Sequence, residues 1–519
     1  MSLRASWLAL LPLTLACGST GESAAVDVWA PESLDAGIDL REQEQPNDTQ
    51  ATETVDDSDT EPEPELPPED DVALPVACPW RDPVAVPEGG LTLTATLPEG
   101  DACGLTLVLT TSRVLSLTVS GTDSVVGAPQ DEPGWSGPRV REAGVWTLAI
   151  KAQGGPVTVE VTDLGPPPGP IAREHSLAWT DSPLVDVCDF ACLMARVAPN
   201  GHGGALLQQW FLRFATTAHS ERVGPALMLE AWAPALGPAP EAWDLSLLPF
   251  KVTGVHSRTD LRNSSYCGEL RVSLASTDPL HKPFHLIFLF QMPPLPGDES
   301  PAGALHCTAT ALFWASLSAL PEADRVAAAT ARAEAVFQAE NFIAAETLEF
   351  LVAPWEWRQW FLTDGPAGIT FENRPLFQTL DTPRLNTPGP DRDAFLEFVA
   401  DNAAALAART VMLPEPFRTL SARVNQGVPW TRLDLAGLPE DALALAGGEK
   451  PLRQALEQIG CPGCHTADAP FVQTNEDRQF SPFYDKELDA RAAALEALAR
   501  GAGAAGAFGP LQSDFIGHP

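Results

Sequence analysis

The chain is short of positive charge and, after its first residues, has no long apolar run. Its 32 Lys and Arg face 69 Asp and Glu, so the formal net charge at pH 7 is −37. That balance disfavours nucleic acid and anionic lipid surfaces as partners. After residue 17, no apolar run approaches the ~20 residues that a bilayer-spanning helix needs. We therefore expect no nucleic-acid partner and no membrane-embedded segment.

The long middle of the chain lacks the common catalytic motifs. Residues 174–450 contain no nucleotide-binding loop, nucleophile elbow or zincin motif. Their helical and alternating patterns predict an α+β domain, large enough for its own core, whose role the sequence does not indicate. Helices are predicted at 203–218, 224–235, 304–318, 321–345 and 391–409, and strands at 249–257, 268–276, 283–291 and in a hairpin of 346–362 with 368–377.

One pentad near the end of the chain, Cys461-Pro462-Gly463-Cys464-His465, has a specific chemical signature. Cys-x-x-Cys-His is the pattern by which c-type haem is attached, through two thiols and an iron-ligating histidine. A zinc knuckle would need a second Cys or His pair nearby. A thioredoxin-like motif would need a βαβ unit, and a structural disulfide would leave His465 unexplained.

The surroundings of the pentad resemble a class-I cytochrome c. Leu452, Leu456 and Ile459 lie at helical spacing before it, and residues 486–500 predict an amphipathic helix after it. The resemblance covers at most residues 451–519. It implies covalently attached haem c, with an iron centre, held by Cys461, Cys464 and the proximal iron ligand His465.

The sixth iron ligand is an open question, because no methionine follows the pentad. Most cytochromes of this class place a methionine there. The candidates are His518, Met412 brought over by the fold, or no ligand, with Tyr484 a remote fourth.

Residues 1–17 predict an export signal that ends in a lipidated cysteine. Arg4 precedes an apolar run, and residues 14–17 (TLAC) resemble a bacterial lipobox with Cys17 as the lipid-bearing residue. An ordinary signal peptide cut nearby is the alternative. Gly18 favours an outer-membrane address, facing the periplasm or the cell surface.

Residues 18–76 predict a disordered tether, and 77–165 predict a small all-β sandwich. The tether has eighteen acidic residues and one basic residue, Arg41, so it repels itself into an extended chain. Residues 44–49 (EQPNDT) and the β region resemble a pre-peptidase C-terminal domain, a non-catalytic module; an unrelated sandwich is equally consistent. Strands are predicted at 91–97, 105–110, 114–119, 145–151 and 156–162.

The remaining cysteines predict disulfides, since an exported chain meets an oxidising compartment. With Cys17 assigned to lipid and two cysteines to haem, six remain as neighbours along the chain. Within the pair Cys188 and Cys192, helical geometry would separate the thiols awkwardly. The six candidates are Cys78 with Cys103, Cys188 with Cys192, and Cys267 with Cys307.

Three further clusters have simple structural explanations. His281 and His285, with His256 and His306, resemble metal ligands only loosely, and we expect ordinary histidines. Glu269 and Arg271 share one face of a strand and predict an ion pair. The tryptophans are expected in a core more than in an electron path; they are Trp355, Trp357 and Trp360.

The sequence thus predicts a multidomain protein with a disordered acidic tether, a small all-β sandwich, an α+β middle domain and an α-helical, cytochrome c-like C-terminal segment. Its most direct role is a monohaem electron carrier that meets redox partner proteins while lipid-anchored to a membrane. The alternatives are a peroxidase-like haem enzyme with an open distal site and a surface binding protein with an accessory haem. Against the enzyme, di-haem peroxidases carry two such pentads.

Overall fold

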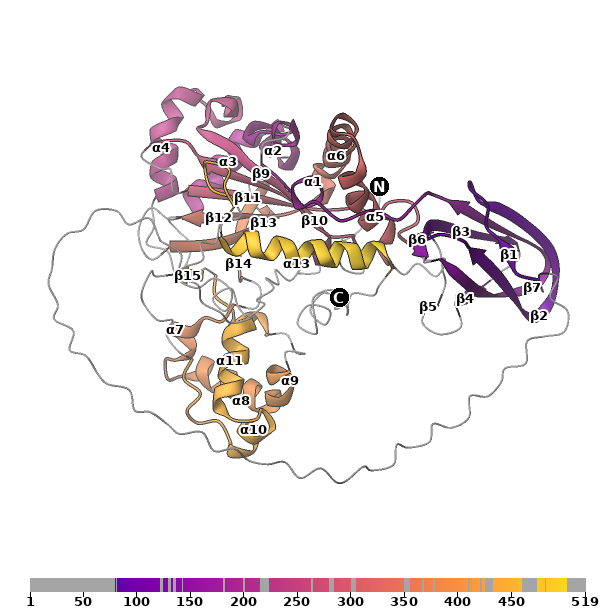
Figure 1. Ribbon diagram of the computed structural model, residues 1–519. Helices are drawn as coiled ribbons and strands as arrows, with labels where there is room; N and C mark the ends of the chain where they lie inside the picture. The colour runs from indigo at the N-terminus through magenta and orange to yellow at the C-terminus, as the bar shows by residue number, and fades with distance from the viewer. Residues whose placement is uncertain are drawn as a thin grey trace, which may run out of the picture. The chain divides into compact units, whose positions relative to one another are not determined.

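The computed structural model describes residues between 80 and 501, with interruptions, and mixes helices with two β-sheets (Figure 1). The predicted export signal and acidic tether lie outside the described residues. No described helix combines the length and the apolar character needed to cross a membrane. The described ranges are 80, 82–121, 125–128, 132–133, 137–141, 143–180, 183–198, 201–214, 224–262, 265–279, 284–299, 305–349, 355–365, 368–376, 379–408, 411, 413–420, 422–424, 433–459, 474–480 and 482–501.

The first sheet is built around two long strands, β2 (Leu91–Leu109) and β7 (Gly144–Asp163), which pair antiparallel along most of their length. Its strand order is β1-β2-β7-β3-β6, with β4 also paired to β7. Alternate side chains of these strands, such as Leu107, Ile150 and Val159, form one buried core. The shorter strands are β1 (Val84–Ala85), β3 (Arg113–Gly121), β4 (Val125–Ala128), β5 (Glu132–Pro133) and β6 (Gly137–Arg141).

The two longest strands of this sheet each combine two strands that the sequence predicts separately. The predicted strands 91–97 and 105–110 are both parts of β2, and 145–151 and 156–162 are both parts of β7. The β2–β7 ladder continues across a register shift near the middle of β2. The prediction of separate strands was therefore wrong, because the Gly and Pro residues between them do not end the pairing.

The second sheet is antiparallel throughout, in the order β14-β13-β12-β11-β10-β9-β8, with β15 added on β13. Most neighbouring strands are also consecutive in the sequence. The predicted hairpin of 346–362 with 368–377 is confirmed in its second half, as β13 paired with β14, whereas residues 346–349 belong to β12. The strands are β8 (Ala178–Trp179), β9 (Phe250–Arg258), β10 (Glu269–Ser276), β11 (Phe284–Gln291), β12 (Phe342–Glu349), β13 (Trp355–Gly365), β14 (Gly368–Arg374) and β15 (Ala422–Val424).

One side of the second sheet, here called the apolar face, carries the main core. Strand β10 places Leu270, Val272 and Leu274 on it, in register with Phe290, Phe288 and Leu286 of β11, and each of the six is at most 1% exposed. Five helices that precede β12 in the sequence contribute side chains to the same core. They are α2 (Phe190–Val197), α3 (Gly203–Phe214), α4 (Gly224–Leu236), α5 (Thr308–Ser316) and α6 (Glu322–Val336).

A second group of helices has a core of its own. Leu385, Phe395, Val399, Leu452 and Leu456 are buried together in it. Its helices are α7 (Thr382–Leu385), α8 (Pro390–Asp401), α9 (Ala403–Ala407), α10 (Glu440–Leu445) and α11 (Glu449–Ile459). A further short helix, α1 (Arg173–Ser176), does not belong to this group and lies before β8 in the sequence.

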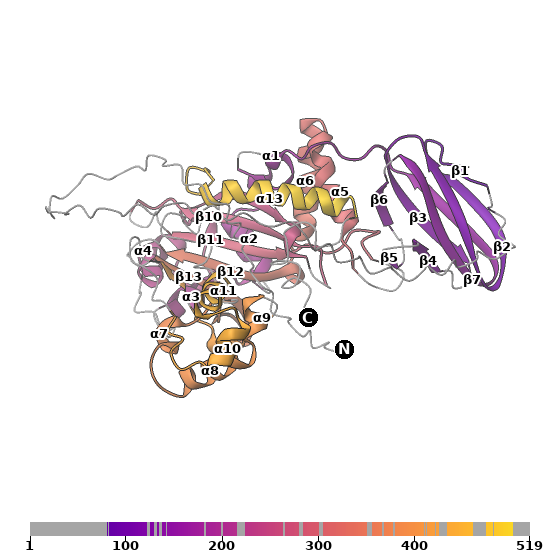
Figure 2. The same cartoon turned by 60° about the horizontal axis from the view of Figure 1, so that its bottom comes forward.

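The last described helix, α13 (Pro482–Ala499), packs against α5 beside the second sheet (Figure 1, Figure 2). It confirms the helix predicted at 486–500. Leu488 and Leu495 join the main core, while Tyr484 and Arg491 on the same stripe are 2% and 1% exposed. This stripe therefore combines apolar packing with buried polar groups.

The long Ala-rich helix predicted at 321–345 was wrong in its second half. Helix α6 ends at Val336, and the chain enters β12 at Phe342. Ala344 and Ala345 are fully buried between the neighbouring strands β11 and β13. Pairing on both edges outweighs the helix preference of alanine, which is a weak local term.

The described cysteines are all in disulfides. Cys188 is bonded to Cys192 and Cys267 to Cys307, each with a Cα–Cα distance of 5.2 Å. The expected difficulty at Cys188 does not arise, because this residue precedes the first turn of α2 instead of lying within the helix. Cys103 is also disulfide-bonded, and its predicted partner Cys78 lies outside the described residues.

Candidate functional site

The predicted haem-binding pentad at 461–465 lies outside the described part of the chain. It falls between α11, which ends at Ile459, and Thr474, where the described chain resumes. The amphipathic helix predicted before the pentad is confirmed as α11, with Leu452 and Leu456 fully or nearly fully buried. Helices with known packing thus precede and follow the pentad in the sequence.

Of the candidates for the sixth iron ligand, Tyr484 alone lies in the described part of the chain. His518 and Met412, like the predicted lipid-bearing Cys17, lie outside the described residues. Tyr484 is described, and its hydroxyl is hydrogen-bonded to His256 Nδ1 at 3.0 Å and to Arg491 Nη1 at 3.0 Å. Because both contacts are buried, Tyr484 is committed to these two residues.

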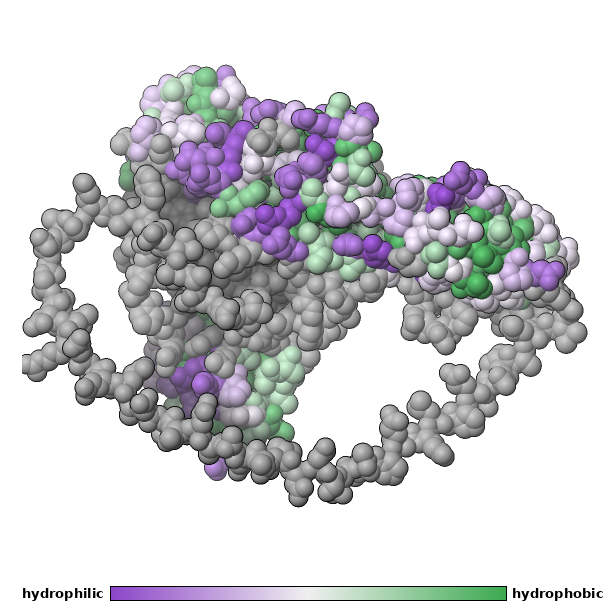
Figure 3. Space-filling view, in the orientation of Figure 1, coloured by the Kyte–Doolittle hydropathy of each residue, from purple (hydrophilic) through white to green (hydrophobic). Residues whose placement is uncertain are grey.

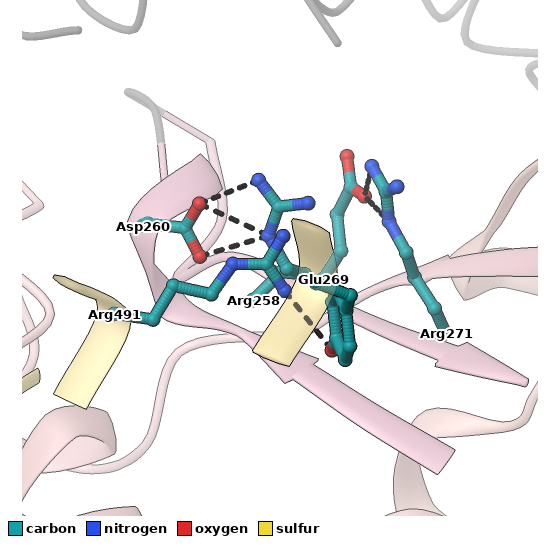
Figure 4. Close-up of polar contacts among 6 residues, drawn as sticks. Arg258, Asp260, Glu269, Arg271 and Arg491 are labelled. Carbon is teal, nitrogen blue, oxygen red and sulfur yellow. Dashed lines mark hydrogen bonds and ion pairs between the residues drawn. The ribbon is translucent and has the colours of Figure 1, made fainter. Parts of the chain in front are cut away.

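The side of the second sheet opposite the apolar face, here called the charged face, contains buried ion pairs (Figure 4). The Arg258 guanidinium binds Asp260 with an Nη2–Oδ2 distance of 2.6 Å, and Arg271 binds Glu269 with an Nη2–Oε2 distance of 2.7 Å. The second pair confirms the prediction. Since breaking a buried pair typically costs about 3–5 kcal/mol, these contacts constrain the face strongly.

Helix α13 adds two side chains to this face, Tyr484, which contacts His256, and Arg491. The guanidinium of Arg491 lies over the Tyr484 ring, 4.7 Å from its centroid, and donates to the phenol oxygen. The phenol oxygen in turn lies against His256 of β9, whose ring meets the tyrosine edge-on. Residues 228 positions apart in the sequence are therefore linked directly.

His256 is held in its neutral form. Burial lowers the pKa of the imidazole well below its usual range, and the positive charges of Arg491, Arg271 and Arg258 lower it further. The phenol oxygen already accepts a hydrogen bond from Arg491. We therefore assign the phenol O–H as the donor to Nδ1 of His256, which leaves the imidazole N–H proton on Nε2. Within the described part of the chain, this buried Nε2 has no hydrogen-bond partner.

Glu346 of β12 is the other unusual group on the charged face. Its carboxyl is 2% exposed, and Oε1 has no hydrogen-bond partner among the described residues. Burial raises its pKa to about 7, with Glu269 also raising it and Arg271 and Arg258 opposing the rise. A buried carboxyl that titrates near neutral pH is a candidate for proton exchange.

The histidines considered as metal ligands do not form a site within the described ranges. No group of three or more His, Cys, Asp or Glu side chains there is arranged to hold a metal ion. His285 is buried on the charged face, where burial lowers its pKa to about 4. His281 lies outside the described residues, and His256 serves the contact with Tyr484.

The tryptophan group divides between the two faces of the second sheet. Trp360 is a core residue as predicted, packed against Phe214 and Trp210 and donating to Thr347. Trp357 is 3% exposed on the charged face, in register with Leu348. Their role is therefore mainly structural in this arrangement.

Comparisons with known proteins give no relative: no protein-family model, curated protein or solved structure matches the chain. The visible surface of the described residues mixes hydrophilic and hydrophobic side chains (Figure 3). The two parts of the chain with chemically unusual residues are the pentad and the buried charged face.

Several members of the charged face were missed from the sequence. Arg258 and Asp260 repeat the spacing that identified the Glu269–Arg271 pair, so a search for opposite charges two residues apart would have found them. Glu346 and Arg491 carry no such signal. Their importance depends on burial created by distant segments, which local spacing does not contain.

Proposed function

We propose that this chain is an exported, lipid-anchored c-type cytochrome that transfers electrons through one covalently attached haem. The observation that supports it is the pentad 461–465, in which two thiols and a histidine have the spacing for haem attachment. The finer domain assignment belongs to the same proposal: an acidic tether, a β-sandwich, an α+β domain, and a cytochrome c-like segment at 451–519.

The cysteines fit this assignment. Every described cysteine is already disulfide-bonded, and two of the bonds join described cysteines to each other. The described cysteines are therefore not free to form disulfides with Cys461 or Cys464. If Cys78 pairs with Cys103 as predicted, Cys461 and Cys464 both remain for haem attachment. The donor set of two thiols and one imidazole matches what haem c requires.

The chain's own residues would fix the cofactor from both directions. Haem supplies an iron that changes oxidation state, and Cys461, Cys464 and His465 would hold it. On one side α11 is anchored through its buried leucines. On the other side, Thr474 Oγ1 lies 2.9 Å from Thr253 Oγ1 on β9, and Tyr484 follows with its contact to His256. A segment anchored at both ends restricts the haem position, which favours electron transfer.

In this proposal, the N-terminal residues determine where in the cell the protein is held. Lipid on Cys17 would anchor the mature chain to the outer membrane, facing the periplasm or the cell surface. The acidic residues of 18–76 repel one another, so they would extend as a tether and give the haem reach toward redox partner proteins. Replacing Cys17 with Ala should abolish the membrane-bound mature form in cell fractionation.

Attachment is tested on a denaturing gel. Protein from a host that matures c-type cytochromes should keep haem on the polypeptide, detected by haem-dependent peroxidase staining. The double variant Cys461→Ser/Cys464→Ser should lose the stain at equal protein loading. An unstained wild-type band, with another c-type cytochrome stained in the same host, would remove the haem proposal.

A peroxidase-like haem enzyme is the second candidate, and two observations favour it. No methionine follows Cys464, and Tyr484 is committed to His256 and Arg491. An electron carrier fills both axial positions, so a low-spin spectrum would favour that role, whether through His518 or Met412. A high-spin iron that binds carbon monoxide or cyanide quickly and consumes peroxide would favour the enzyme.

A further inference from the structure

We propose that the edge of β2 at residues 91–97 is a self-association surface, which pairs antiparallel with the same strand of a second copy of this chain. In the described part of the chain, this half of β2 has one neighbouring strand, β7. Among the described residues, the other side of β2 pairs only with β1, at Leu107 and Val108. A strand with one neighbour presents a row of backbone N–H and C=O groups that another strand can bind.

This edge lacks the features that protect the edges of most natural sheets from pairing. Between Leu91 and Leu97 the sequence is LTLTATL, without proline or charge. By comparison, the end strand β6 contains Pro138, the end strand β14 contains Glu372 and Arg374, and the end strand β8 is only 2 residues long. The edge of β2 is therefore better suited to pairing than these other strands.

The apolar side of the edge is only partly covered. Leu91, Leu93 and Ala95 pack against the core of the first sheet but are partly exposed, whereas their cross-strand partners on β7 are at most 1% exposed. These partners are Val161, Val159 and Val157. Because burial of apolar surface is favourable, a strand added at this edge would stabilise the pair by covering what remains exposed.

The stretch is complementary to itself. With Thr94 on a two-fold axis, Thr92 lies opposite Thr96 of the second copy, and Leu93 lies opposite Ala95. Because side chains alternate along a strand, this pairing keeps the threonines on one face and the apolar side chains on the other. The sheet would therefore continue from one copy into the next with the same two faces.

The two ends of the stretch limit the register. Gly90 has a φ of +91°, and a Cβ there would lie 1.9 Å from the carbonyl oxygen of Val161, so only glycine fits where β2 begins. At the other end, Pro98 has no backbone N–H to donate. Full overlap of residues 91–97 in two antiparallel copies is reached only with Thr94 on the axis.

Charge opposes this pairing and does not drive it. The formal net charge of −37 makes two copies repel one another. The acidic residue just before the edge, Glu88, is already paired, with 3.1 Å between its Oε1 and Arg113 Nη2. Salt screens the repulsion but weakens backbone hydrogen bonds and apolar contacts little. The Kd of the dimer should therefore fall at least about threefold when sodium chloride is raised from about 0.05 M to about 0.5 M.

Sedimentation equilibrium of the full-length chain in a mild detergent measures this Kd. Thr94→Lys places two like charges opposite each other at the axis, so self-association should weaken at least about tenfold. The matched control, Thr118→Lys on β3, adds the same charge at an exposed threonine on the same face, but β7 separates it from β2. This control should associate like the parent chain, and equal thermal midpoints show that both variants fold.

A cross-link tests the register. Side chains at position 94 of the two copies would have Cβ atoms about 5 Å apart, within reach of a short bis-maleimide. Thr94→Cys should therefore give a covalent dimer. Thr118→Cys should give only the background of the parent chain, because about five strand spacings, or ~24 Å, separate it from its counterpart. A monomeric parent chain, a dimer that Thr94→Lys leaves intact, or a Thr94→Cys product with a different protein would each overturn the proposal.

Discussion

The two faces of the second sheet are both buried, yet they are built from opposite kinds of side chain. On β10, Leu270, Val272 and Leu274 point to the apolar face, while Glu269 and Arg271 point to the charged face. The apolar face packs against helices in the manner of an ordinary core. The charged face buries ion pairs, whose net contribution to stability is small or negative relative to apolar packing.

The difference shows where the molecule departs from the demands of folding. A sheet needs one apolar face to form a core, and the aromatic residues of β11 satisfy that need. Nothing in folding requires Glu346 or His256 to be buried with atoms that lack hydrogen-bond partners among the described residues. Such costs concentrate at functional sites, so the charged face, more than the apolar one, is the candidate for chemistry.

The largest expected effect comes from breaking an ion pair on the charged face. Arg271→Met leaves the Glu269 carboxylate buried without its partner, which should lower the free energy of unfolding by about 3–5 kcal/mol. The double variant Glu269→Gln/Arg271→Met should recover much of that loss in denaturant titrations. A single variant as stable as wild type would show that the charged face is solvated in solution.

Glu346→Gln should have a smaller effect that depends on pH. The native carboxyl has a pKa of about 7, against an ordinary value of 4.5, so between these two pH values only the native state keeps its proton. Its stabilising contribution is present below pH 4.5 and lost as pH rises through 7. The free energy of unfolding of the variant should therefore rise relative to that of wild type over this range, by up to about 3 kcal/mol. In the control Glu372→Gln, which replaces a carboxylate 49% exposed, this gain should be absent.

The smallest effect should come from removing the hydrogen bonds that Tyr484 of α13 makes on the charged face. Tyr484→Phe removes the hydroxyl that joins His256 to Arg491, at a cost of about 1–3 kcal/mol. The matched control is Arg173→Ala on α1, which breaks exposed ion pairs with Asp485 and Asp489 of the same helix and should cost at most about 1 kcal/mol. Equal losses in both variants, measured by thermal unfolding, would mean that the buried contact has no special weight.

Local pattern was sufficient to predict most elements of the second sheet. The strands expected at 249–257, 268–276 and 283–291 agree with β9, β10 and β11 to within about one residue at each end. Long apolar or alternating runs bounded by turns carry this information. Where the prediction was wrong, in the second half of 321–345, alanines gave no local preference for a strand, and pairing with distant strands decided the outcome.

The charged face could not be predicted as buried. Alternation of charged and apolar residues along β10 normally indicates a polar side turned to solvent. Here Tyr484 and Arg491 cover part of that side, from a helix that lies more than two hundred positions later. The pair Glu269–Arg271 could be predicted because its members are two residues apart, whereas the pKa of Glu346 depends on groups from two other strands.

The most direct test of the proposed function is the intact mass of the purified chain under denaturing conditions. Protein from a host that matures c-type cytochromes should carry the added mass of one haem, because two thioether bonds survive unfolding. The Cys461→Ser/Cys464→Ser variant should have only the mass of its polypeptide and its lipid. A wild-type chain without the haem mass, from cells in which another c-type cytochrome is fully loaded, would contradict the assignment of the pentad.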